Sequence, residues 1–101
     1  MIKGTTPTFQ LILDDQTLDL TSAVNIYATF RQGKTEITKT GADIEVSAHE
    51  VDVYLSQAET LSLSYGKVDI QLNWTYVGGL RRCSTIVSVD VSHNLIERVL
   101  E

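Results

Sequence analysis

Residues 68–91 read VDIQLNWTYVGGLRRCSTIVSVDV and decide the fold class. Apolar and polar side chains alternate on both sides of Gly78-Gly79, as they do in two strands that each have one buried face. Two glycines between such runs are typical of a two-residue hairpin turn, because that turn needs positive φ angles. The stretch therefore predicts an antiparallel hairpin of Val68–Val77 and Leu80–Val91.

A two-residue turn also fixes the register of this hairpin. It places Ile70 opposite Val87 and Trp74 opposite Cys83, so that apolar residues meet on one face, as a correct register requires. We therefore expect Trp74 to be buried in the core. We expect the thiol of Cys83 to be buried on the same face and unreactive.

The same alternation continues outward from the hairpin in shorter runs, at residues 9–13, 24–30, 44–46 and 51–55. Two other segments look helical. Ser56 and Glu59 have the capping-box spacing of a short helical turn near residues 56–62, and a short helix or turn is predicted over Asn94–Leu100. About seven short strands predict an all-β, antiparallel, immunoglobulin-like sandwich, with a small barrel as the alternative.

Length and composition describe one domain over residues 1–101. The net charge of −5 argues against binding to nucleic acid or to an anionic membrane surface. The one cysteine excludes an intramolecular disulfide. Pro7 and the neighbouring threonines interrupt any signal-peptide core, and no run approaches the ~18 apolar residues of a membrane span, so we expect cytoplasmic synthesis.

No pattern in the sequence indicates chemistry. Neither His49 nor His93 has a second histidine or a cysteine at the spacing of a metal site. The chain contains no nucleophile elbow, and its acidic pairs, such as Asp14-Asp15, are typical of solvated turns and strand faces. We therefore predict a protein that is not an enzyme, has no catalytic, cofactor-binding or metal-binding residues, and folds without a cofactor.

Two groups of residues are candidate partner contacts. Four apolar side chains share one face of the predicted C-terminal helix: Leu95, Ile96, Val99 and Leu100. A helix this short is not stable alone in water, so either the domain's own core or a partner must cover that face. Arg81 and Arg82 follow the hairpin turn, where they would either contact an acidic partner or keep the hairpin soluble.

Four short motifs, in the same order, make the chain resemble a family of small proteins encoded in the tail-gene region of phages and prophages of Gram-positive bacteria. They read IKGTTPT at 2–8, FRQGK at 30–34, LSQAETL at 55–61 and VDIQ at 68–71. The resemblance spans residues 2–91. The last residues, IERVLE at 96–101, depart from the Leu-Lys-Asp-Gly-like tail of the family.

The resemblance implies a β-sandwich protein that is a structural or assembly component of a phage tail or baseplate and carries no catalytic residues. Its partners would be other phage structural proteins or copies of itself in a homo-oligomer, and it would be associated with the virion. The alternative is a small binding module that recognises a host-surface carbohydrate or protein. Exposed aromatic side chains lying in one plane, such as Tyr27 and Tyr54, would favour that alternative.

Overall fold

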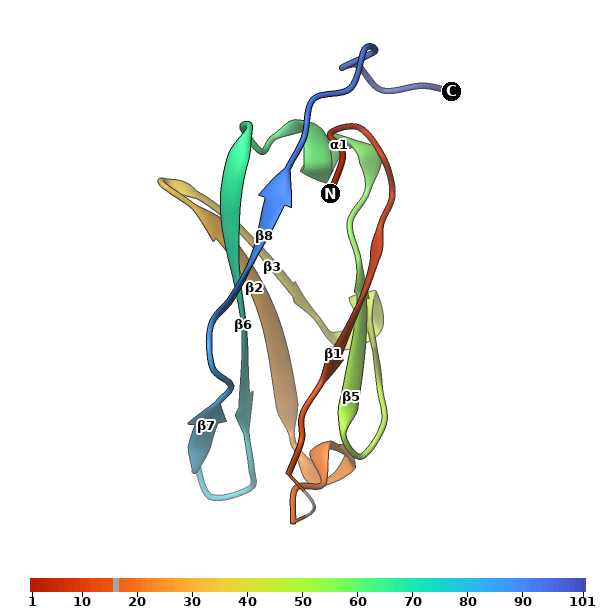
Figure 1. The fold of residues 1–101 in the computed structure, drawn as a ribbon. Coiled ribbons are helices and arrows are strands. Elements are labelled where there is room, and N and C mark those ends of the chain that lie inside the picture. Colours follow the sequence, from red (N-terminus) through yellow and green to blue (C-terminus); the bar gives the residue numbers. More distant parts are fainter. Residues whose placement is uncertain (16) are drawn as a thin grey trace.

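The computed structural model describes residues 1–15 and 17–101. Its strands form two antiparallel sheets that face each other as a sandwich (Figure 1). One sheet has the order β1-β5-β4, with bounds Thr8–Ile12, Glu50–Tyr54 and Ile44–Val46. The other has the order β3-β2-β6, followed on the far side of β6 by both β7 and β8, with bounds Thr35–Thr40, Asn25–Gln32, Gly66–Thr75, Arg81–Cys83 and Val87–Val91. The predicted all-β sandwich is confirmed, with eight strands instead of about seven.

The core lies between the sheets and is built from alternate residues of the long strands. On β6 the inward side chains are Val68, Ile70, Leu72 and Trp74, and Trp74 is 4% exposed. They pack against buried residues of β2 and β5 that include Ala28, Phe30, Val51 and Val53. Each large apolar side chain buried in this way contributes about 1.5–3 kcal/mol to folding. The predicted burial of Trp74 is confirmed.

The register of the long hairpin was predicted correctly for β8 and wrongly for β7. Ile70 lies opposite Val87, as expected. The turn, however, has a three-residue loop, because the backbone N–H of Tyr76 donates to the carbonyl of Leu80 at 2.9 Å. The pairing of β7 with β6 is therefore shifted by one residue. Such a shift turns side chains to the opposite face of the sheet, and Cys83 is exposed instead of buried.

A break between β7 and β8 restores the register. At residues 84–86 the chain leaves the ladder and takes up one extra residue, as in a β-bulge. Ser84 stays bonded to β6 at this point. Its N–H donates to the carbonyl of Leu72, and its Oγ accepts from the N–H of Leu72, both at 2.9 Å. The side chain of Gln71 donates to the carbonyl of Ser84 at 2.9 Å.

The predicted helical turn near residues 56–62 is confirmed as α1 (Gln57–Leu61), and the capping box at its start is formed. Single 3₁₀ turns occur at η1 (Leu20–Ser22) and η2 (Gly41–Asp43). Over residues 94–100, where a short helix or turn was predicted, the chain bends at Leu95 and Arg98 and forms no helix. In the described part of the chain, no helix has the length and apolar character needed to cross a membrane.

The first residues close one end of the sandwich (Figure 1). Ile2 forms a parallel bridge with Ser92, next to the end of β8. The hydroxyl of Thr60 on α1 is fully buried, accepts from the N–H of Gly4 at 2.9 Å and donates to the carbonyl of Thr5 at 2.8 Å. The IKGTTPT motif therefore joins the edges of the two sheets at this end.

Candidate functional site

The C-terminal segment, residues 93–101, projects beyond one end of the sandwich (Figure 1). It is attached to the domain mainly through polar and stacking contacts. The ring of His93 stacks on Tyr65 with centroids 4.9 Å apart. The side-chain amide of Gln57 accepts from the N–H of Leu100 at 2.7 Å and donates to its carbonyl at 2.9 Å. Contacts of this kind hold the segment in place without burying its apolar side chains.

The apolar side chains of this segment are exposed. Their exposed fractions are 104% for Leu95, 46% for Ile96, 54% for Val99 and 48% for Leu100. The domain's own core does not cover them, so the first of the two explanations offered for the stripe is wrong. Several exposed apolar side chains in one short segment make it the candidate contact surface of this end of the molecule.

The start of the segment holds the contacts of a helix N-terminus although no helix follows. The side-chain oxygen of Asn94 accepts from the N–H of Ile96 at 3.2 Å, and the carboxylate of Glu97 accepts from the N–H of Asn94 at 3.1 Å. The contact from Glu97 is one half of a capping box, whereas Asn94 bonds to the N–H two residues on, as an N-cap side chain also can, and not to the N–H of Glu97. The hydrogen bond from the Asn94 N–H, and then that from His93, lower the pKa of Glu97.

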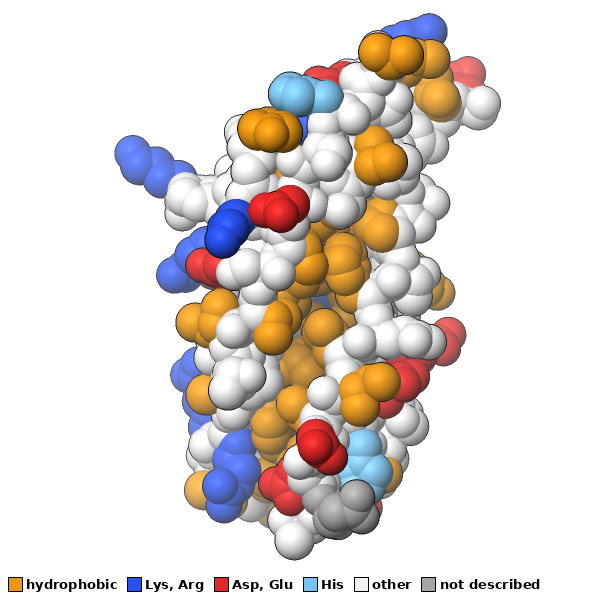
Figure 2. Space-filling model, viewed as in Figure 1, with side chains coloured by type: hydrophobic (Ala, Val, Ile, Leu, Met, Phe, Trp, Pro, Cys, Tyr) orange, Lys and Arg blue, Asp and Glu red, His pale blue; other side chains and the backbone are white. Residues whose placement is uncertain are grey.

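A second feature is a groove between the facing edges of the two sheets, which we call the seam groove. It runs between β1 and the β7–β8 edge, where the described residues show no strand pairing across the gap. A hollow of about 330 Å³ there is lined by Leu11, Leu13, Ile70, Leu72, Thr85 and Val87, among others. Figure 2 shows apolar side chains along this gap, between polar rims.

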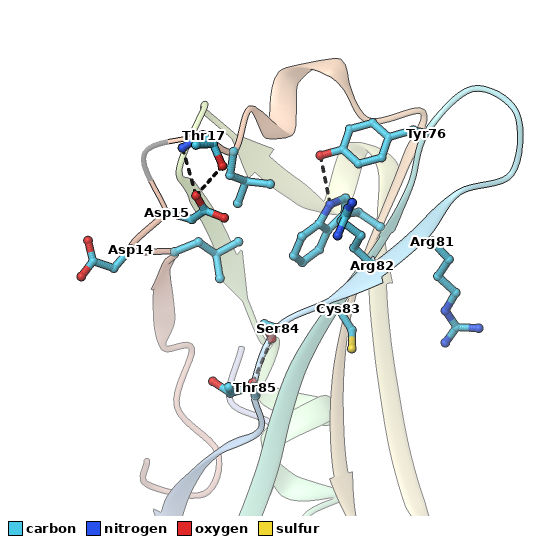
Figure 3. A pocket seen from close by; sticks show the side chains of 12 residues that line it. Asp14, Asp15, Thr17, Tyr76, Arg81, Arg82, Cys83, Ser84 and Thr85 are labelled. Atoms are coloured by element: carbon cyan, nitrogen blue, oxygen red, sulfur yellow. Dashed lines mark hydrogen bonds between the residues drawn. The ribbon is translucent and has the colours of Figure 1, made fainter.

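The seam groove widens at the hairpin end into a hollow of about 660 Å³ (Figure 3). The indole N–H of Trp74 donates to the hydroxyl of Tyr76 at 3.2 Å on one wall. Asp15 lies on the other wall, where its carboxylate accepts from the hydroxyl and the N–H of Thr17 at 2.7 and 2.9 Å. These hydrogen bonds lower the pKa of Asp15, with a smaller contribution from the charge of Arg82. The mouth thus carries charges of both signs.

The structure separates the predicted partner contacts. Arg81 lies on the outer face of β7 and donates to the side-chain oxygen of Asn73 at 3.0 Å. Arg82 is the cross-strand neighbour of Trp74 and lines the mouth of the groove. Both arginines follow the hairpin, at the end of the molecule opposite the C-terminal segment (Figure 1). They therefore do not form one surface with Leu95 and Leu100.

Other candidate residues do not converge on a site. Tyr27 is on β2 and Tyr54 is on β5, which belong to different sheets, so they do not share a plane. His49 lies in the connection between β4 and β5. Among residues 1–15 and 17–101 there is no group of three or more histidine, cysteine, aspartate or glutamate side chains that could hold a metal ion.

Several polar residues of the family-like motifs hold the chain's own backbone. Gln32 of FRQGK accepts from the N–H of Ser64 at 2.6 Å and donates to its carbonyl at 2.7 Å. Glu59 of LSQAETL forms an ion pair of 2.6 Å with Lys39 on β3. Burial raises the pKa of Glu59, but the hydrogen bonds from Lys39 and Ser56 outweigh it, so that the pKa is lowered. These motif residues stabilise the sandwich.

The seam groove could not be recognised in the sequence. Its lining residues lie on strands that are distant in the sequence, and the groove depends on which strand edges stay unpaired. Comparison with family models, curated proteins and solved structures finds no match for this chain. The likeness of its motifs to a phage family therefore stays a prediction.

Proposed function

We propose that this protein is a non-enzymatic structural or assembly component of a phage or prophage tail or baseplate, and that it acts through protein–protein contacts. The observation that carries the proposal is the exposed apolar cluster of the C-terminal segment. The resemblance of the four motifs supplies the phage context. A structural role also fits the use of polar motif residues as contacts within the sandwich.

The segment is a contact for a partner because it is costly to leave in water. At about 25 cal/mol per Å² of apolar area removed from water, four such side chains favour association by several kcal/mol before entropy losses are counted. The domain holds the segment at its edge by exposed polar contacts, so a partner can reach it without unfolding the core. The partners proposed are other structural proteins of the particle or copies of this chain.

The proposal is tested with the products of the genes that flank this one. Each is co-expressed with the full chain, and the mass of the purified species is measured by light scattering during size exclusion. We expect at least one neighbour to co-elute, and the double substitution Leu95→Glu, Val99→Glu to release it. The matched control is Val24→Glu, which changes an exposed valine outside the segment.

Two outcomes would overturn the proposal. One is a gene neighbourhood without particle genes. The other is a complex that forms equally well with the segment variant, because the contact would then lie elsewhere.

A further inference from the structure

We infer that the C-terminal segment of one copy binds in the seam groove of a second copy, so that copies associate head to tail. This rests on the proposed function and narrows its partner to a second copy of the chain. Two apolar surfaces carry the inference: the segment, which the domain does not cover, and the groove between β1 and the β7–β8 edge. Both surfaces are apolar and stay uncovered within one copy, so each can cover the other.

The segment can present all four of its apolar side chains to a groove only as a helix. Leu95, Ile96, Val99 and Leu100 then share one face, whereas an extended chain would divide them between two faces. Asn94 and Glu97 already form the capping contacts that begin such a helix. A helix laid with its apolar face in a hydrophobic groove is a recurrent way for proteins to bind a segment of another chain.

The segment is badly placed to bind in its own groove. It starts after Ser92, at the end of the seam that the bridge to Ile2 closes, and it leads away from the sandwich (Figure 1). The wide mouth of the groove, beside Trp74 and Arg82, is at the hairpin end (Figure 3). A seven-residue helix spans only about 10 Å, against a longest molecular dimension of 46 Å. The segment of a second copy is not attached to this molecule, so its length does not limit which part of the groove it can reach.

The charges of the two surfaces are complementary. With the apolar face in the groove, the other positions of the helix are Glu97, Arg98 and Glu101. The mouth of the groove carries Asp15 on one wall and Arg82 on the other. On such a helix Glu97 and Arg98 border the apolar face on opposite sides, whereas Glu101 lies opposite that face and points away from the groove. Glu97 and Arg98 can therefore meet Arg82 and Asp15, which sets the direction in which the segment enters.

This contact uses different surfaces on the two copies. Such an interface closes into a ring or continues as a filament, because each copy keeps a free groove or a free segment. The contact is also small. Interfaces that bury less than ~1,200 Å² are usually weak and transient, so association should rise with protein concentration.

The test uses full chains with one surface changed at a time. Leu95→Glu, Val99→Glu disables the segment, and Val87→Lys disables the groove by placing a charge among its lining residues. Both leave the fully buried core residues unchanged, since Val87 is 49% exposed. Val24→Lys is the matched control, an exposed valine that lines a different hollow. Circular dichroism checks that every variant is folded. Sedimentation equilibrium then measures mass at about 10 µM to 1 mM, concentrations that span micromolar to millimolar dissociation constants.

We expect the wild type and Val24→Lys to gain mass with concentration, and each disabled variant to stay monomeric. The decisive sample mixes the two disabled variants, which together have one intact segment and one intact groove. It should give a two-chain complex and no larger species. Failure of this mixture to associate, or loss of association in Val24→Lys, overturns the inference.

A wild type that stays monomeric also overturns the inference, while the proposed function stands if the segment variant still releases the neighbouring gene product. The proposed function fails independently of the inference if the chains associate head to tail but the gene neighbourhood holds no particle genes.

Discussion

The seam between the two sheets ends differently at its two ends, and the difference shows how this domain treats its strand edges. At one end, Ile2 pairs with Ser92, and the buried hydroxyl of Thr60 satisfies the backbone of the first residues. At the other end, β1 and β7 face each other across a groove with an apolar floor. The chain thus uses its own backbone to close one end, and at the other end the described strand edges stay unpaired.

Truncating Trp74, whose side chain forms the floor of the groove at the open end, should have the largest effect on stability. Trp74→Ala deletes a side chain that is 4% exposed and should lower the free energy of unfolding by about 3–5 kcal/mol, as large-to-small core substitutions do. Urea denaturation measures the loss. The matched control Tyr27→Ala removes an aromatic ring that is 37% exposed and should cost less than ~1 kcal/mol. Similar losses for the two variants would show that the groove floor is not part of the core.

The closed end should be weakened by removal of one hydroxyl. Thr60→Val keeps the shape of the side chain but leaves the N–H of Gly4 and the carbonyl of Thr5 without their partner, which should cost about 1–3 kcal/mol. Thr60→Ser keeps the hydroxyl and should lose only the contribution of one methyl group, about 0.8 kcal/mol. Chemical denaturation gives both values, and amide exchange at Gly4 should quicken in the valine variant alone. Equal exchange in both variants would contradict this account of the closed end.

Acidification should have the smallest effect on stability. It should act on the C-terminal segment, which lies beside the closed end. The pKa of Glu97 lies below its ordinary value of 4.5, because the carboxylate accepts hydrogen bonds from the Asn94 N–H and from His93. A group whose folded pKa is lowered stabilises the folded state above its unfolded pKa, and this contribution is lost as the pH falls through the folded pKa. NMR titration should therefore show Glu97 protonating below 4.5, with the Asn94 amide shifting in step.

Glu97→Gln is the control for that titration. It should remove the pH dependence of the Asn94 amide while leaving the thermal midpoint almost unchanged. An Asn94 amide that still shifts over the same pH range in this variant would assign the effect to another group.

The sequence was sufficient for the parts of the fold that depend on local pattern. The alternation in residues 68–76 predicted a strand with Trp74 inward, and the Ser56–Glu59 spacing predicted α1 with its capping box. Both signals act within a few residues of the chain. The pairing of Ile70 with Val87 also followed from the pattern, because apolar residues on both strands must meet on the core side.

The errors arose where two local solutions fit the same residues. Gly78-Gly79 suits a two-residue turn and a three-residue loop alike, and the observed loop includes Val77, so that β7 shifts by one and Cys83 faces outward. The stripe of residues 95–100 suits a helix only if something covers it, and a single copy supplies no cover. The groove itself depends on the assembled sheets, which no short motif encodes.

The break at Ser84 separates two parts of the hairpin that would otherwise be rigidly coupled. In an uninterrupted ladder, adding one residue near the tip would exchange the inward and outward sides all the way to the end of the strand. Here the side chains of Ser84 and Gln71 form hydrogen bonds across the break between β7 and β8. Val89 therefore stays half-buried and Val91 buried, whichever register β7 takes against β6. A residue added or removed at the tip therefore changes what is presented at the mouth of the groove without disturbing the interior.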